Sequence, residues 1–133
     1  NPTYNKYCKL LKIQPNQIKK LSHIPYLPIQ FFKTHKITSN NKSISHLFKS
    51  SGTSGSRSTN YVSDIKLYEH SYRKCFEFFY GPIKNFVFLG LLPSYLEQKN
   101  SSLVYMVNDF IKQSKYQESE FYLKNYKKLQ NTL

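Results

Sequence analysis

A run of small polar residues at positions 50–59 places the strongest constraint on the fold of this 133-residue chain. Every residue in the run except Arg57 is a glycine or carries a hydroxyl group, so the run cannot pack a hydrophobic core. On its two sides, residues 45–49 and 60–63 alternate between apolar and polar side chains, which is typical of strands. The sequence therefore predicts a β-hairpin with this run at its turn.

The same run has the composition of an anion-binding loop. Glycine adopts backbone conformations that are closed to other residues, and it lets a phosphate approach the main chain. Successive backbone N–H groups that point into one concavity then form an anion site. A flexible Ser/Gly linker is the alternative interpretation of the composition.

The glycine spacing excludes two common nucleotide-binding motifs. A Walker A loop has four residues between its glycines and a Lys-Ser/Thr pair directly after the second. Gly52 and Gly55 have only two residues between them, and the cation Arg57 follows one residue late. A Rossmann fingerprint needs three glycines at set spacing between a strand and a helix. The run therefore matches neither motif.

Three segments carry a resemblance to a known family. The sequence Ser-Ser-Gly-Thr-Ser-Gly at 50–55 resembles the phosphate loop of adenylate-forming enzymes. Upstream, residues 24–35 read IPYLPIQFFKTH, and downstream, residues 91–97 and 100–107 read LLPSYLE and NSSLVYMV. In order and spacing these segments are similar to the acyl-protein synthetase family, relatives of the synthetase component of bacterial bioluminescence fatty-acid reductase. The resemblance spans nearly the whole chain.

The resemblance implies ATP- and Mg²⁺-dependent activation of an acyl carboxylate to an acyl-adenylate. The acyl group would then pass to a thiol-bearing acceptor, either a protein or coenzyme A. A coenzyme A ligase of the phenylacetate type shares the loop and is an alternative. The residues implied to bind the nucleotide are those of the loop, with Arg57 as a further cation: Ser50, Ser51, Gly52, Thr53, Ser54, Gly55 and Arg57. The catalytic residues are unknown, because the other motifs of the family would fall beyond Leu133.

The predicted fold class is α/β: a partial amino-terminal portion of an adenylate-forming large domain, with helices that flank a β-hairpin and a buried strand. We expect one incomplete domain over 1–133. Within it, 1–37 form a helical and extended lead-in, 38–63 form the hairpin with the phosphate loop, and 64–133 form a helix, a strand and two helices. We also expect the chain to be a fragment of a longer protein that is inactive alone.

The second half of the chain has the clearest helix and strand signals. Asp64 is a good N-cap, apolar residues recur at helical spacing over 65–79, and Gly81-Pro82 ends that helix. The apolar run from Ile83 to Leu92 predicts a strand buried on both faces. Ser101 or Ser102 can cap a further helix, and a last helical stripe covers 122–133.

A net charge of +13, from 20 Lys and Arg against 7 Asp and Glu, raises nucleic acid as a partner. The basic residues are dispersed from Lys6 to Lys128, and the chain contains no alanine, which fits codon drift toward A and T. We therefore expect no specific nucleic-acid partner, only a generic affinity for polyanions that salt weakens. A small basic nucleic-acid-binding module is the alternative function.

The remaining candidate groups have ordinary structural interpretations. Cys8 and Cys75 have no spacing typical of a metal site, and their small number favours a reduced, cytoplasmic location. Cys75 is expected to be a buried thiol on the apolar face of its helix. His35 is interpreted as structural. The longest apolar stretch, 86–92, is far shorter than the ~20 residues that span a membrane.

Overall fold

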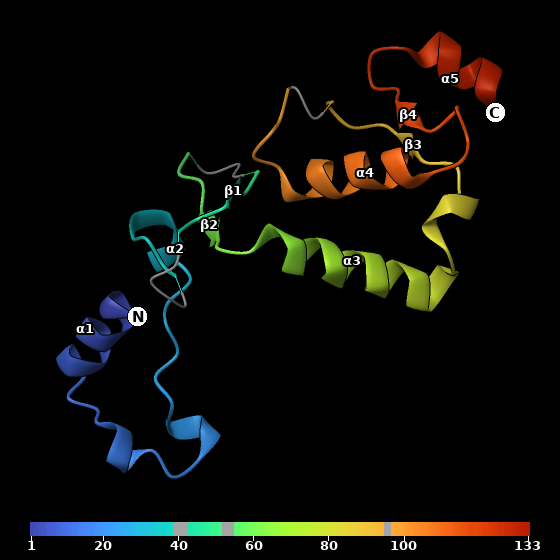
Figure 1. Cartoon of the computed structure of the whole chain (residues 1–133). Coiled ribbons are helices and arrows are strands. Elements are labelled where there is room, and N and C mark those ends of the chain that lie inside the picture. The colour runs from blue at the N-terminus through green and yellow to red at the C-terminus, as the bar shows by residue number, and fades with distance from the viewer. Residues whose placement is uncertain (39–42, 52–54, 95–96) are drawn as a thin grey trace. The chain divides into compact units, whose positions relative to one another are not determined.

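The computed structural model describes residues 1–38, 43–51, 55–94 and 97–133 (Figure 1). The chain divides into two compact units, Asn1–Ser63 and Asp64–Leu133, each of which is considered by itself. Among the described residues the fold is mixed α/β, with five α-helices and two two-stranded sheets. The predicted class is confirmed at this coarse level. The assignment to an adenylate-forming large domain and the division into one incomplete domain stay predictions.

The first unit begins with short helical segments. Helix α1, Pro2–Leu10, starts where the Asn1 side chain accepts a hydrogen bond from the backbone N–H of Tyr4, at 3.0 Å. Pro2 suits the first helical position because its missing N–H would have had no partner there. Two separate 3₁₀ turns follow in this helical and extended lead-in, Pro15–Gln17 and Leu21–His23. Ile24 has an extended backbone, residues 25–28 belong to no helix or strand, and the short helix α2, Phe31–Thr34, follows.

The predicted hairpin is confirmed. Strands β1, His46–Lys49, and β2, Thr59–Val62, pair in antiparallel register, with Lys49 opposite Thr59 at the end nearer the turn. Phe48 is the buried side chain of β1, and its ring lies 4.7 Å from that of His46. The described part of the run before Thr59, residues 50–51 and 55–58, therefore lies between two paired strands, and Thr59 begins β2.

The second unit begins with α3, Ile65–Tyr80, whose ends are those that the sequence predicts. The Asp64 carboxylate accepts hydrogen bonds from the backbone N–H groups of Lys66 and Leu67, at 3.0 and 3.4 Å. At the other end, Gly81 has φ +92°, a conformation that favours glycine and ends the helix.

The strand predicted from Ile83 to Leu92 is wrong over most of its length. Residues Ile83–Asn85 form a 3₁₀ turn, and only Leu89–Gly90 form a strand, β3. Its partner β4, Glu120–Phe121, is also two residues long, so the parallel ladder cannot extend further. Val87 and Leu91 are 44% and 53% exposed, so the segment is not buried on both faces.

A helix connects these two parallel strands, as parallel pairing requires. Helix α4, Ser102–Gln113, begins at Ser101, whose hydroxyl accepts a hydrogen bond from the Val104 N–H. It lies beside α3 and runs in the same direction, because Tyr68 bonds Ser102 near the start of both helices and Arg73 bonds Asp109 further along (Figure 1). The last helix, α5, is Tyr126–Thr132, shorter than the stripe predicted over 122–133.

The core of the second unit is aromatic. Tyr72, Ile83 and Phe110 form its buried cluster, against which five partly buried residues pack: Tyr68, Phe76, Phe88, Tyr105 and Met106. Tyr122 is fully buried, and its backbone N–H donates to the Gly90 carbonyl at 2.8 Å. Phe88, which immediately precedes β3, packs in this core against Phe76 of α3 and Phe110 of α4.

Candidate functional site

The base of the hairpin turn is closed by a reciprocal pair of hydrogen bonds. The Ser50 N–H donates to the Ser58 carbonyl, and the Ser58 N–H donates to the Ser50 hydroxyl oxygen, both at 3.0 Å. Ser50 therefore has its amide and one acceptor position of its hydroxyl engaged within the hairpin. Its hydroxyl proton is still available to donate to a ligand.

Of the other predicted nucleotide-binding residues, Gly52, Thr53 and Ser54 lie outside the described residues. Ser51, Gly55 and Arg57 are exposed on either side of them. Gly55 has φ +84°, and a Cβ placed on it would meet no atom within 4 Å. This backbone conformation is one that a left-handed turn requires, and the space around it lets a ligand approach the main chain.

The electrostatics of the first unit favour an anion. All 7 acidic residues of the chain lie at or after Asp64, so the first 63 residues carry Lys and Arg but no side-chain carboxylate. An anion at the hairpin turn would therefore meet no acidic side chain from its own unit. The ammonium of Lys36 lies 5.8 Å from the centre of the Tyr61 ring in β2, which places one cation beside the hairpin.

His35 lies apart from the turn in a local aromatic contact. Its Nδ1 is 2.8 Å from the Thr34 hydroxyl oxygen, and its ring lies 4.9 Å from that of Phe31. These contacts agree with the structural interpretation. Cys8 is half-buried, whereas Cys75 is exposed, so the prediction of a buried thiol at Cys75 is wrong. Cys75 instead lines a cavity of about 490 Å³ together with Phe76 and Phe79.

No group of three or more His, Cys, Asp or Glu side chains in the described part of the chain could hold a metal ion. Over the same residues, no helix is long and apolar enough to cross a membrane.

A second polar cluster, which the sequence reasoning missed, lies in the second unit where β3 and β4 end. Ser94, Glu97 and Lys124 line a shallow cavity of about 320 Å³ there. The Ser94 N–H and hydroxyl both donate to Glu97 Oε2, at 2.9 Å each, and the Lys124 ammonium pairs with the other oxygen. Lys124 first, and then Ser94, lower the pKa of Glu97 to about 2. Open α/β sheets bind ligands at the carboxyl ends of their parallel strands. The sequence did not predict β4, so it gave no indication that a pair of parallel strands ends at this cluster.

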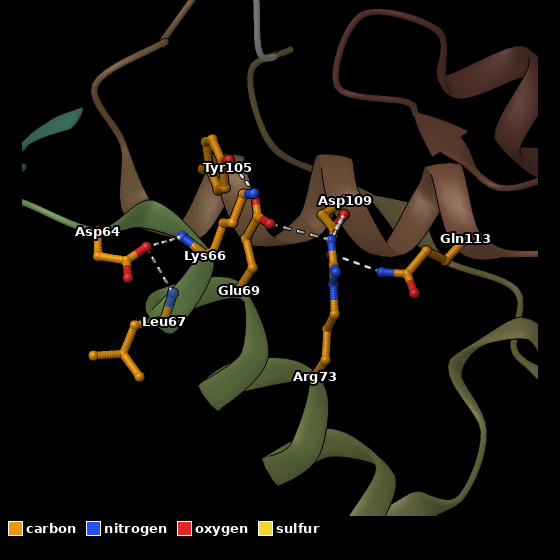
Figure 2. A network of polar contacts seen from close by, with 8 residues as sticks. All are labelled: Asp64, Lys66, Leu67, Glu69, Arg73, Tyr105, Asp109 and Gln113. Carbon is orange, nitrogen blue, oxygen red and sulfur yellow. Dashed lines mark hydrogen bonds and ion pairs between the residues drawn. The ribbon is translucent and has the colours of Figure 1, made fainter. Parts of the chain in front are cut away.

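The helices of the second unit are joined by a network of charged and polar groups (Figure 2). Arg73 on α3 donates two hydrogen bonds to the Asp109 carboxylate on α4, and its guanidinium also lies 3.7 Å from Glu69. Tyr105 donates to Glu69 at 2.5 Å, and Gln113 donates to Asp109 at 2.7 Å. Glu69 and Asp109 each contact side chains of both helices, so the network fixes α3 against α4.

The chain matches one known protein family. The family described as acyl-protein synthetase, LuxE, matches residues 1–107, which include the hairpin, α3, β3 and the first half of α4. No curated protein and no solved structure matches the chain. The family implies the use of ATP, an acyl substrate and an acceptor. Since the match covers most of its 133 residues, the chain belongs to the LuxE acyl-protein synthetase family.

Proposed function

We propose that the hairpin turn binds the phosphates of ATP during activation of an acyl carboxylate. The described residues on either side of 52–54 support the proposal: Ser51 and Gly55 are exposed, Gly55 has a left-handed backbone, and the first unit has no acidic side chain. Backbone N–H groups and hydroxyls in such a turn would neutralise the departing phosphates, and Arg57 would add a cation. Gly52, Thr53 and Ser54 complete the proposed site.

In the proposed first step, a carboxylate oxygen of the acid attacks the α-phosphorus of ATP. The bond from that phosphorus to the bridging oxygen breaks, and pyrophosphate leaves with the electron pair, so that acyl-adenylate forms. Both reactants are anions, which is why a cationic, donor-rich turn would lower the barrier. Mg²⁺ generally binds through substrate phosphates and water, and we propose that it enters with ATP.

In the proposed second step, a thiolate attacks the carbonyl carbon of the acyl-adenylate. A thioester forms, AMP leaves, and the thiol proton goes to solvent. The acceptor is a protein thiol, or coenzyme A as in the phenylacetate-type ligases. Thioester formation assayed separately with coenzyme A and with a protein thiol distinguishes the two acceptors.

The turn is tested by backbone amide shifts on titration with Mg-ATP and with pyrophosphate. We expect shifts at Ser51, Gly55 and Arg57 that are specific to the turn. Gly55→Ala should weaken binding several-fold, because alanine disfavours the left-handed backbone. Gly81→Ala is the matched control: Gly81 also has positive φ and open space at its Cβ, but it lies at the end of α3. Equal effects of the two changes would contradict the proposed site.

Activation is tested by exchange of labelled pyrophosphate into ATP with a panel of straight-chain and aromatic carboxylic acids. Exchange that depends on one acid class would identify the substrate. Turn-specific nucleotide binding without exchange for any acid would support the phosphate site and argue against activation by this chain.

A further inference from the structure

A groove of about 480 Å³ lies beside α1 in the first unit, apart from the hairpin turn. One wall is the face of α1 that carries Tyr4 and Cys8, and the other is the segment that follows the helix, as far as Pro25. The Tyr4 hydroxyl donates to the Pro25 carbonyl at 2.8 Å and so ties the two walls together. All of the lining residues belong to the first unit.

The lining of this groove is mainly apolar. Ile13, Ile18 and Ile24 contribute to it, with Pro25 and the ring of Tyr4. These five residues are half-buried, so each of them keeps apolar surface that a partner can cover. Covering that surface would supply the favourable free energy of docking.

Exposed apolar side chains also lie in the chain segments next to the lining residues. Leu10 directly follows the lining residue Lys9, and Leu21 lies three positions after Ile18. The two leucines are 73% and 79% exposed. Apolar surface both inside a groove and outside it suits a polypeptide segment, which covers more area than a small molecule does.

Lysines flank this apolar surface, and no acidic side chain of the first unit balances them. Lys9 is a lining residue, Lys12 directly precedes Ile13, and Lys19 directly follows Ile18. All three lysines are exposed. The ion pairs that the described residues form all lie in the second unit. A partner with negative charge would therefore be attracted to this surface, and a basic partner would be repelled.

We propose that the groove docks an amphipathic helix of an acidic partner protein. Apolar side chains on one face of that helix, at i, i+3 or i+4 and i+7, enter the groove. Acidic side chains beside them pair with Lys9, Lys12 and Lys19. The concave shape fits such a helix better than a flat anionic membrane, because the half-buried isoleucines line a groove between two walls.

This inference goes beyond the proposed function, because docking needs neither nucleotide nor reaction. Docking can fail while nucleotide binding at the hairpin turn succeeds, and the reverse. The titrations below contain no nucleotide, so they test docking alone.

The cavity of about 490 Å³ that Cys75 lines in the second unit is the competing location for an apolar helix face. Phe76, Phe79 and Met106 also line it, and none of its lining residues carries a cationic or acidic side chain. Helices of either charge would bind there equally well, whereas the proposed groove distinguishes between them. The charge preference and the position of the amide shifts therefore separate the two locations.

The experiment titrates the full ¹⁵N-labelled chain with a designed helical peptide of about four turns. Leucines recur at helical spacing on one face, glutamates flank them, and alanine and glutamine fill the other positions. The control peptides are a scrambled sequence of the same composition and a version with lysine in place of glutamate. We expect amide shifts around Cys8, Lys9 and Ile18, and binding of the acidic helix about tenfold tighter than that of either control.

The contribution of the lysines is tested with two double variants. Lys9→Gln combined with Lys12→Gln should weaken binding of the acidic helix about fivefold through the loss of two exposed ion pairs. Lys33→Gln combined with Lys49→Gln is the matched control. It removes the same charge from exposed positions of the same unit that do not line the groove. We expect the control to weaken binding less than about twofold, because salt screens distant charges.

The contribution of the apolar lining is tested with two isoleucine variants. Ile18→Ser should reduce the affinity for the acidic helix to that for the scrambled peptide. Ile29→Ser is the matched control, since Ile29 belongs to the same unit, is 72% exposed and does not line the groove. If circular dichroism shows that Ile18→Ser is unfolded, Ile18→Ala, with an expected partial loss, replaces it.

Vesicles of anionic lipid and random single-stranded DNA are titrated in parallel. If either of them shifts Cys8, Lys9 and Ile18 while the acidic helix does not, the surface serves a membrane or a nucleic acid and the proposal is wrong. Equal affinity for the acidic helix and its lysine version, or shifts centred on residues 76–80 and 106–110, would also overturn it. So would the absence of acidic-helix binding by the wild-type chain.

Discussion

Arg73 and Asp109 form a bidentate ion pair between α3 and α4, with Nε to Oδ2 at 2.8 Å and a terminal guanidinium nitrogen to Oδ1 at 2.6 Å. The Asp109 side chain is only 17% exposed, so the loss of its partner would leave a poorly hydrated carboxylate. We expect Arg73→Ala to destabilise the second unit by about 1–2 kcal/mol. Urea unfolding followed by the NMR signals of α3 and α4 measures this change.

The control for this pair is the exposed contact between Lys74 and Glu77, at 3.4 Å within α3. Lys74→Ala should cost no more than about 0.5 kcal/mol, because solvent screens the pair. A double-mutant cycle of Arg73→Ala and Asp109→Asn should give a favourable coupling energy. A coupling near zero would mean that the pair forms without stabilising the fold.

The same ion pair makes the free energy of unfolding of the second unit depend on pH. Burial alone would raise the pKa of Asp109, but the Arg73 guanidinium, the nearby Tyr72 hydroxyl and the Gln113 amide outweigh it and lower the pKa. A carboxyl whose pKa is lower in the folded state stabilises that state above its unfolded pKa of about 4 and loses the contribution as the pH falls through its folded pKa. The stability advantage of the wild type over Asp109→Asn should therefore shrink below about pH 4.

Urea midpoints for the second unit, measured between neutral pH and strong acid, test this dependence. The comparison variant is Glu97→Gln. The pKa of Glu97 is also low, but this side chain is 39% exposed, and its ion pair with Lys124 is screened by solvent. We expect a smaller pH-dependent change for that variant. A difference between wild type and Asp109→Asn that stays constant with pH would contradict the assignment.

Two tyrosines of the second unit should respond oppositely to loss of their hydroxyl. The Tyr72 hydroxyl is buried near the Asp109 carboxylate but makes no hydrogen bond of good geometry among the described residues, whereas the Tyr105 hydroxyl donates to Glu69 at 2.5 Å. An unsatisfied buried hydroxyl costs free energy, so Tyr72→Phe should be neutral or stabilise by up to about 1 kcal/mol. Tyr105→Phe should destabilise by about 1 kcal/mol. Urea unfolding of both variants under one set of conditions tests the contrast, and a destabilised Tyr72→Phe would show that the Asp109 carboxylate accepts a stabilising hydrogen bond from that hydroxyl.

Position 90 in β3 requires glycine because the Phe121 ring of β4 lies close to its backbone. A Cβ at this position would lie 3.0 Å from Cδ1 of the Phe121 ring in β4 and 3.5 Å from the Glu120 carbonyl oxygen. We expect Gly90→Ala to destabilise the second unit by about 1–3 kcal/mol through overpacking. Phe121→Leu, which removes the ring edge, should recover part of that loss when the two changes are combined. Purely additive effects, measured by the same unfolding experiment, would show that the ring is not the obstacle.

Local signals predicted the parts of the fold that depend on local contacts. Asp64 and Gly81 mark helix ends where the sequence placed them, and Ser101 is one of the two serines that the sequence offered as a cap. The hairpin was predictable for the same reason, since its alternating strands and turn are contiguous in the chain. These elements required no knowledge of distant residues.

The failures concern elements whose state depends on a distant partner. The apolar content of residues 83–92 predicted a long strand, but the partner β4 offers only two residues for pairing. The polar stretch 112–119 hid β4 itself and the fully buried Tyr122 that follows it. The ion pair between Arg73 and Asp109 joins residues 36 positions apart, and no spacing rule connects them. In the candidate site, composition identified the turn, but only the coordinates showed that Ser50 is engaged with Ser58.

The acid-free first unit also predicts how the chain binds polyanions. Its cations are dispersed, so binding to single-stranded or duplex DNA should come from charge alone and carry no sequence preference. Log affinity should fall linearly with log salt concentration, and binding should be lost by about 0.2 M salt. Fluorescence anisotropy with random-sequence single-stranded and duplex probes measures the slope. Replacing two exposed lysines of the first unit, Lys19 and Lys20, by glutamine should make the slope of log affinity against log salt less steep. The same change at Lys127 and Lys128, which lie near acidic residues of the second unit, should reduce the slope by a smaller amount. Sequence-selective binding that persists at that salt concentration would favour a nucleic-acid-binding module over the acyl-activating function.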